Sequence, residues 1–95
     1  MDYVNTIAVD LAEGSDPAAL GGAVTVALCG HWDHDGDCVW PHFSSVSDDG
    51  DTTVLTTTFT AEPAEEPHVR RLIATALERG ELVGPDGVTS RWTVR

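Results

Sequence analysis

The feature that most constrains this fold is one amphipathic segment near the C-terminus, which stands between segments of β-type alternation. Its apolar residues recur at the spacing of one helix face: Val69, Leu72, Ile73, Ala76 and Leu77. Pro67 suits the first turn of a helix, and Gly80 suits its end. The sequence therefore predicts one amphipathic helix that covers one face of a sheet.

Alternating apolar and polar residues, or runs of threonine, predict strands on both sides of this helix. The segments are residues 3–12, 23–32, 42–47, 52–60 and 88–94. Three Asp-Gly pairs stand among them, and Asp-Gly favours the type I′ turn of a β-hairpin. The pairs are Asp35-Gly36, Asp49-Gly50 and Asp86-Gly87.

The order of strands, helix and strand predicts an α+β domain with a mainly antiparallel sheet of four to five strands. A right-handed crossover would place the last strand parallel to the Thr-rich segment 52–60. Residues 13–21 are expected to form a loop with one helical turn after Asp16-Pro17. A chain of 95 residues suffices for one core, so we expect a single domain over 1–95.

The balance of charge excludes several classes of protein. The chain carries 16 Asp and Glu against 5 Lys and Arg, a formal net charge of −11. Such a charge repels phosphate backbones, so we expect no binding to nucleic acid. No apolar run approaches the ~20 residues that span a bilayer, so we expect no membrane association. Residues 1–5 lack the basic and apolar regions of a secretory signal, so we expect a cytoplasmic protein.

The cationic side chains all lie beyond residue 69: Arg70, Arg71, Arg79, Arg91 and Arg95. A GC-rich coding bias or a high-salt proteome would produce this composition without any partner. Alternatively, the acidic body suits a basic protein partner, or the arginine-bearing end of a second copy in a weak homodimer. We expect such an association through an open sheet face that carries Trp40 and Phe59.

One segment, residues 29–42, gathers the side chains that bind transition metals. It contains both cysteines and three of the four histidines, at a spacing that matches no standard zinc finger: Cys29, His31, His34, Cys38 and His42. Thiolate and imidazole together are the ligands that zinc prefers, and copper, nickel or iron also accept them. The segment therefore predicts a transition-metal site, with zinc as the first candidate.

A hairpin would bring three of these ligands together. If Asp35-Gly36 is a two-residue turn, Cys29 lies opposite His42, and His31 lies on the same face. We expect these three side chains to share one ion on the sheet face that points away from the helix.

The other two candidates need a distorted hairpin. Cys38 lies on the same face but ~13 Å along the ladder from Cys29, and His34 lies on the opposite face. Pro41 cannot donate a hydrogen bond in a central ladder, so a break there would bring Cys38 and His34 to the ion.

Other interpretations of the same segment stay open. Cys29 and Cys38 would form a disulfide only in an oxidising compartment. Cys29 with His31 or His42 would form a nucleophile pair in a small enzyme, although the chain carries no established catalytic motif. Without metal, the domain would serve as a protein–protein interaction module. The favoured function is that of a small acidic zinc-binding domain acting as a binding or accessory protein.

Overall fold

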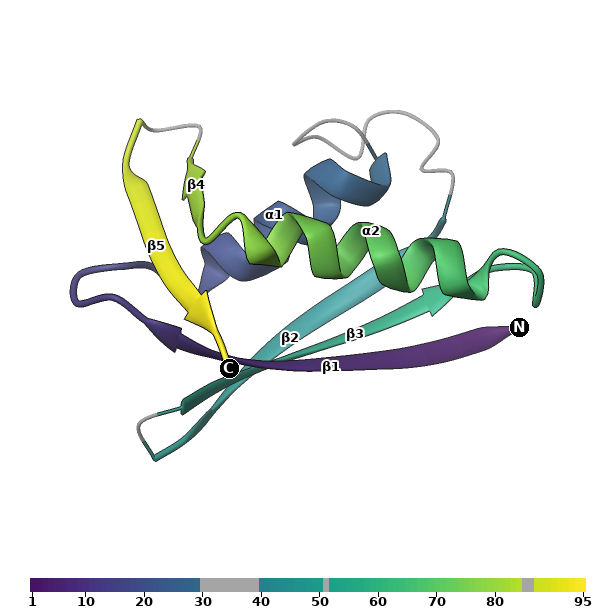
Figure 1. The fold of residues 1–95 in the computed structure, drawn as a ribbon, viewed down its shortest axis with the longest axis horizontal. Helices are drawn as coiled ribbons and strands as arrows, with labels where there is room; N and C mark the ends of the chain where they lie inside the picture. The colour runs from purple at the N-terminus through teal and green to yellow at the C-terminus, as the bar shows by residue number, and fades with distance from the viewer. Residues whose placement is uncertain (30–39, 51, 85–86) are drawn as a thin grey trace.

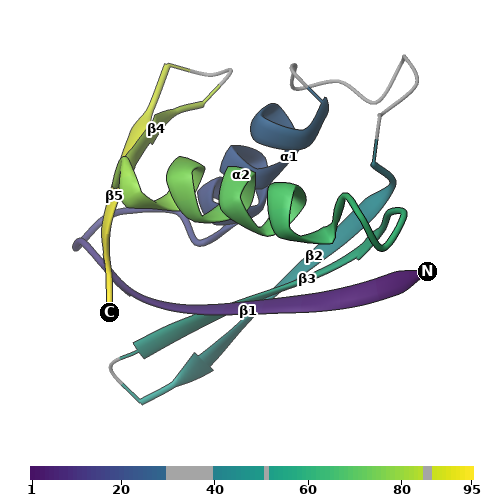
Figure 2. The ribbon, with the colours of Figure 1, turned by 45° about the vertical axis from the view of Figure 1, so that its right-hand side comes forward.

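The computed structural model describes residues 1–29, 40–50, 52–84 and 87–95, and it has two helices packed on one face of a five-stranded antiparallel sheet (Figures 1 and 2). In chain order the elements are β1 (Asp2–Leu11), α1 (Ala18–Cys29), β2 (His42–Asp49), β3 (Thr52–Thr60), α2 (Glu66–Glu78), β4 (Glu81–Val83) and β5 (Thr89–Val94). The α+β class and the antiparallel sheet are those that the sequence predicts. Within these residues, no helix has both the length and the apolar character to cross a membrane.

The sheet order is β2-β3-β1-β5-β4, and every neighbouring pair is antiparallel. Two strands that flank a common neighbour are therefore parallel: β1 with β2 across β3, and β3 with β5 across β1. The predicted parallel relation of the Thr-rich strand and the last strand is confirmed. The result is the split β-α-β-β-α-β arrangement of ferredoxin-like folds, with β4 as an added strand.

Residues 18–29 form helix α1, so the predictions of a strand over 23–32 and of a single helix are wrong. The apolar residues of this segment satisfy the helix period better than the alternation of a strand: Leu20, Ala23, Val24 and Leu28 are 0%, 6%, 0% and 2% exposed. Asp16 caps the start of the helix, because its Oδ1 accepts a hydrogen bond from the backbone N–H of Ala18 at 2.9 Å. The expected single turn after Asp16 thus continues into a helix of 12 residues.

Helix α2 carries the predicted apolar stripe and packs it against the core. Val69, Ile73 and Leu77 are completely buried, whereas Leu72 is only partly buried against them. The strands meet this stripe with side chains on one face of the sheet: Val9, Leu55, Phe59 and Trp92. The core therefore lies between the two helices and this face, and the opposite face is open.

The β2–β3 hairpin does not place Asp49-Gly50 at the centre of its turn. Asp49 still pairs with Thr52, so the connection consists of residues 50–51. Gly50 adopts a positive φ of 67° there. Asp35-Gly36 and Asp86 lie outside the described residues, so the predicted Asp-Gly hairpins are not confirmed.

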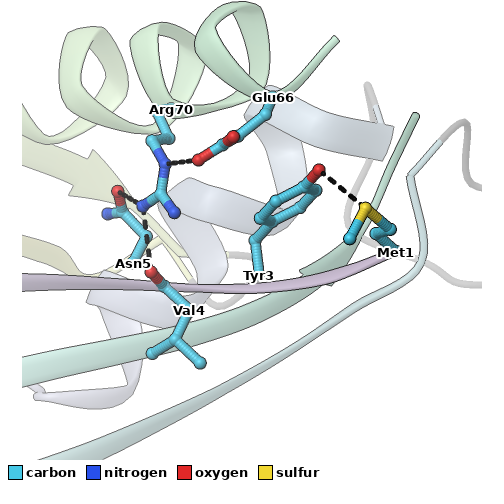
Figure 3. Close-up of polar contacts among 6 residues, drawn as sticks. All are labelled: Met1, Tyr3, Val4, Asn5, Glu66 and Arg70. Carbon is cyan, nitrogen blue, oxygen red and sulfur yellow. Dashed lines mark hydrogen bonds and ion pairs between the residues drawn. The ribbon is translucent and has the colours of Figure 1, made fainter. Parts of the chain in front are cut away.

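Strand β1 has a partner strand on only one side along most of its length. β5 pairs with it at Val9–Leu11 alone, and α2 supplies a cation to the remaining edge (Figure 3). Arg70 donates to the Val4 carbonyl at 2.9 Å and to Asn5 Oδ1 at 3.1 Å. Its Nε is 2.8 Å from Glu66 Oε2, one turn earlier in the helix. A cation held in this way protects the open edge against pairing with another chain.

Candidate functional site

The structure separates the two ends of the predicted metal-binding segment onto different elements. Cys29 is the last residue of α1, and His42 is the first residue of β2. His31, His34 and Cys38 lie outside the described residues. Because Cys29 belongs to a helix, it does not pair with His42 across a β-ladder, and the predicted hairpin over 29–42 is wrong at this end.

His42 lies on the helix-covered face of the sheet, not on the open face. It pairs with Phe59 of β3, which is 1% exposed beneath the helices. The next residue, Phe43, points to the other side and is 72% exposed. The predicted orientation of His42 is therefore wrong, because the strand that pairs with β2 is β3 and not residues 23–32. A change of one residue in register moves every side chain of a strand to the other face.

The half-buried imidazole of His42 is oriented by contacts at both ring nitrogens. Nδ1 lies 3.1 Å from the Trp40 carbonyl oxygen, which can only accept a hydrogen bond. Nδ1 therefore carries the proton, and in the neutral ring Nε2 holds a lone pair. Nε2 lies 3.2 Å from Thr25 Oγ1, so the Thr25 hydroxyl donates to it. These contacts fix the tautomer and direct Nε2 towards α1.

The contact with Thr25 places His42 beside helix α1. Thr25 precedes Cys29 by four residues in α1, so their backbone positions are one helical turn apart. His42 therefore contacts α1 one helical turn before Cys29. The sequence identified Cys29 and His42 as candidates but did not identify Thr25 as a partner of His42. The reason is that the alternation in residues 23–32 predicts a strand, whereas Thr25 lies in α1.

Trp40 is held on the helix side by α2. Its indole N–H donates to Glu65 Oε2 at 3.3 Å, and its ring meets the ring of His68 edge-on at 5.6 Å between centroids. Phe59 is buried, so neither Trp40 nor Phe59 provides the predicted apolar centre of the open face. Among the described residues, the large aromatic side chain exposed there is that of Phe43, at 72%.

Among the residues that the structure describes, no three His, Cys, Asp or Glu side chains gather closely enough to hold a metal ion. From the described residues, the site therefore offers the oriented imidazole of His42. No known protein family, curated protein or solved structure matches the chain.

Proposed function

We propose that the segment from Cys29 to His42 binds a transition-metal ion, with zinc as the first candidate, and that the chain is a small acidic binding or accessory domain. The observation that carries this proposal is the oriented imidazole of His42, which contacts α1 at Thr25, four residues before Cys29.

The tautomer of His42 suits a metal ligand. Histidines that bind metals usually donate their second ring N–H to a carbonyl or carboxylate, which orients the ring. The Trp40 carbonyl provides this acceptor, and Nε2 is the nitrogen left to bind the ion. Binding would replace one neutral hydrogen bond from the Thr25 hydroxyl by a coordinate bond.

The remaining ligands would come from the same segment. Zinc in structural sites takes four ligands, almost always from cysteine and histidine. The Cys29 thiolate and the side chains of His31, His34 and Cys38 supply the required types within 14 residues. Such a site would bind zinc without any contribution from the rest of the domain.

The test is the metal content of protein purified without an affinity tag, followed by titration with Zn²⁺ against a chromogenic chelator. We expect one equivalent of zinc in the wild-type chain and none in the double variant Cys29→Ala/His42→Ala. The matched control is His68→Gln, because His68 is the one histidine outside the segment. Circular dichroism of each variant separates loss of the ligands from loss of the fold.

Two results would overturn the metal proposal. One is a wild-type chain that takes up no zinc at micromolar free metal. The other is a His68→Gln variant that loses as much zinc as the double variant. Co²⁺ offers a second readout, since thiolate coordination gives a charge-transfer band that the Cys29→Ala variant lacks.

A second function, association with a basic protein, is favoured by the open face of the sheet. Phe43 and Val4 are 72% and 56% exposed, and both lie beside Thr58 in the strand register. The net charge of −11 favours a basic partner over a second copy, because two copies repel each other. Exposed ion pairs contribute only ~0–1 kcal/mol each, so the two apolar side chains would supply the centre of the contact.

Sedimentation and titration with an arginine-rich peptide test this second function. We expect the wild-type chain to bind the peptide at low salt and to release it in molar salt, and Phe43→Ser to bind more weakly. A Phe43→Ser variant that binds as well as the wild-type chain would remove the open face from the contact. A monomer–dimer equilibrium of the chain alone that loosens with salt would instead favour the homodimer.

A further inference from the structure

A pocket of about 290 Å³ lies between α1, the end of α2 and the edge strand β4. Helix α1 contributes Ala23, Val26 and Ala27 to its wall, and β4 contributes Glu81–Val83. Helix α2 contributes Ala76, and Arg79 follows the last residue of that helix. The small side chains leave an apolar hollow, and β4 stands beside α1 in both ribbon views (Figures 1 and 2).

Arg79 brings a positive charge to this pocket and forms no ion pair with a carboxylate of the described residues. Three of the five arginines form ion pairs: Arg70 with Glu66 at 2.8 Å, Arg91 with Glu81 at 3.3 Å and Arg95 with Asp10 at 2.8 Å. Within the described residues, Arg71 and Arg79 form none, and of these two only Arg79 lines the pocket. The acid of the pocket, Glu81, is held by Arg91. In a chain of net charge −11, a cation left unpaired in a pocket favours an anionic ligand.

The free side of β4 offers backbone hydrogen-bonding groups to the same pocket. The Gly80 carbonyl accepts from Trp92 N–H at 2.9 Å, and Gly84 N–H donates to the Val88 carbonyl at 2.8 Å. Hydrogen-bonded pairs alternate along an antiparallel ladder, so Leu82, midway between these glycines, also bonds to β5. The peptide groups of the residues on either side of Leu82 therefore point away from β5, where β4 has no strand neighbour.

The corner that carries Arg79 is fixed by close packing. Gly80 turns the chain from α2 into β4 with a φ of +73°. The buried indole N–H of Trp92 donates to the Leu77 carbonyl at 2.8 Å, which ties the last turn of α2 to β5. The backbone of Arg79 is thus held in place at the rim of the pocket.

We propose that this pocket binds the C-terminal end of a partner protein. The partner's last residues would extend β4 as an added strand, an apolar last side chain would enter the alanine-lined hollow, and the terminal carboxylate would pair with Arg79. Edge-strand addition and capture of a chain end are established modes of peptide recognition. Ligand pockets range over roughly 300–1,000 Å³, so a volume at the lower limit suits one or two side chains rather than a large cofactor. The proposal does not depend on metal binding.

The experiment uses the whole chain, labelled with ¹⁵N, and a five-residue peptide that ends in leucine with a free carboxylate. We expect chemical-shift changes at Ala27, Leu82 and Val83. The same peptide with an amidated C-terminus should bind at least about tenfold more weakly, because it lacks the charged group that pairs with Arg79. Arg79→Gln should weaken binding of the free-carboxylate peptide by a similar factor. Ala27→Leu, which fills the hollow, should weaken it without any change of charge.

The matched control is Arg71→Gln, which removes the same charge from α2 at a position outside the pocket lining. Binding by Arg71→Gln should equal that of the wild-type chain, and an equal loss in both arginine variants would overturn the pocket in favour of general charge attraction. Equal binding of the amidated peptide, or shift changes confined to other elements, would also overturn it. If 4-methylpentanoate alone binds as tightly as the peptide, the site recognises a small aliphatic acid and not a chain end. Thermal unfolding of each variant confirms that the fold is intact.

Discussion

Replacement of Gly80 by alanine tests the close packing at the corner between α2 and β4. Gly80 adopts a φ of +73°, and a Cβ built there would lie 2.8 Å from the Trp92 carbonyl oxygen. That oxygen belongs to the backbone of β5, and Trp92 N–H already donates to the Gly80 carbonyl at 2.9 Å. The clash therefore cannot be relieved by rotation of a side chain, and α2 and β5 have to move apart.

The expected loss combines two effects. A left-handed conformation costs a non-glycine residue roughly 1–2 kcal/mol, and alanine offsets part of this, about 0.4–1 kcal/mol, by restricting the unfolded chain. Overpacking in a close-packed region adds about 1–3 kcal/mol. Gly80→Ala should thus lose about 2–4 kcal/mol of the free energy of unfolding. Gly14 is the matched control, because its φ is +81° and a Cβ there would meet nothing within 4 Å. Gly14→Ala should lose only ~1 kcal/mol, from the conformational effect alone.

The assay is urea unfolding followed by tryptophan fluorescence, since Trp92 is 4% exposed and lies at the corner itself. Thermal unfolding should agree, with a fall in Tm of about 4–8 °C for each kcal/mol in a domain of this size. The difference between the two variants isolates the steric contribution, provided that the urea m-values match. If Gly80→Ala loses no more than Gly14→Ala, the contact with the Trp92 carbonyl has no energetic weight and the corner is not closely packed.

Four further substitutions test the elements around this corner. Ile73→Ala should lower the free energy of unfolding in urea by about 2–5 kcal/mol, because Ile73 is completely buried. Leu72→Ala should lower it clearly less, because Leu72 is only partly buried. Equal losses would contradict the packing of α2. Trp92→Phe removes the indole donor from the Leu77 carbonyl and should lose about 1–3 kcal/mol, measured by calorimetry; a smaller loss would mean that water replaces the donor. Asp16→Ala should lose about 0.5–2 kcal/mol and lower the helical circular dichroism, whereas an unchanged spectrum would show that α1 needs no cap.

The elements with one strong period were predictable from the sequence. The apolar stripe of α2 predicts a helix, the alternation in β1 and β5 predicts strands, and the folded chain has these elements. Three of the five stripe residues are completely buried: Val69, Ile73 and Leu77. The parallel relation of β3 and β5 followed from the handedness of crossover connections.

Helix α1 was not predictable because its local signals conflict. Val24, Thr25 and Val26 favour a strand, and Gly21 and Gly22 disfavour a helix interior. Packing decides the outcome, because a crossover helix is needed to join the parallel strands β1 and β2. At Gly21 the helix packs against β2, since a Cβ there would be in ordinary van der Waals contact with Cβ of Ser44, at 3.5 Å.

Because Cys29 ends helix α1, the ligands of a metal site at residues 29–42 could not be positioned by the pairing of two strands over this segment. A hairpin would have to place its ligands by strand register, and Pro41 would interrupt that register. In the folded chain β2 is an edge strand, and Pro41 stands just before it, where its carbonyl accepts from Thr60 N–H at 2.9 Å. Proline is tolerated at such a position, since little of the ladder depends on its missing donor. The ligand geometry then depends on a connection between a fixed helix end and an oriented His42, so the double variant Cys29→Ala/His42→Ala removes a candidate ligand from each end of that connection.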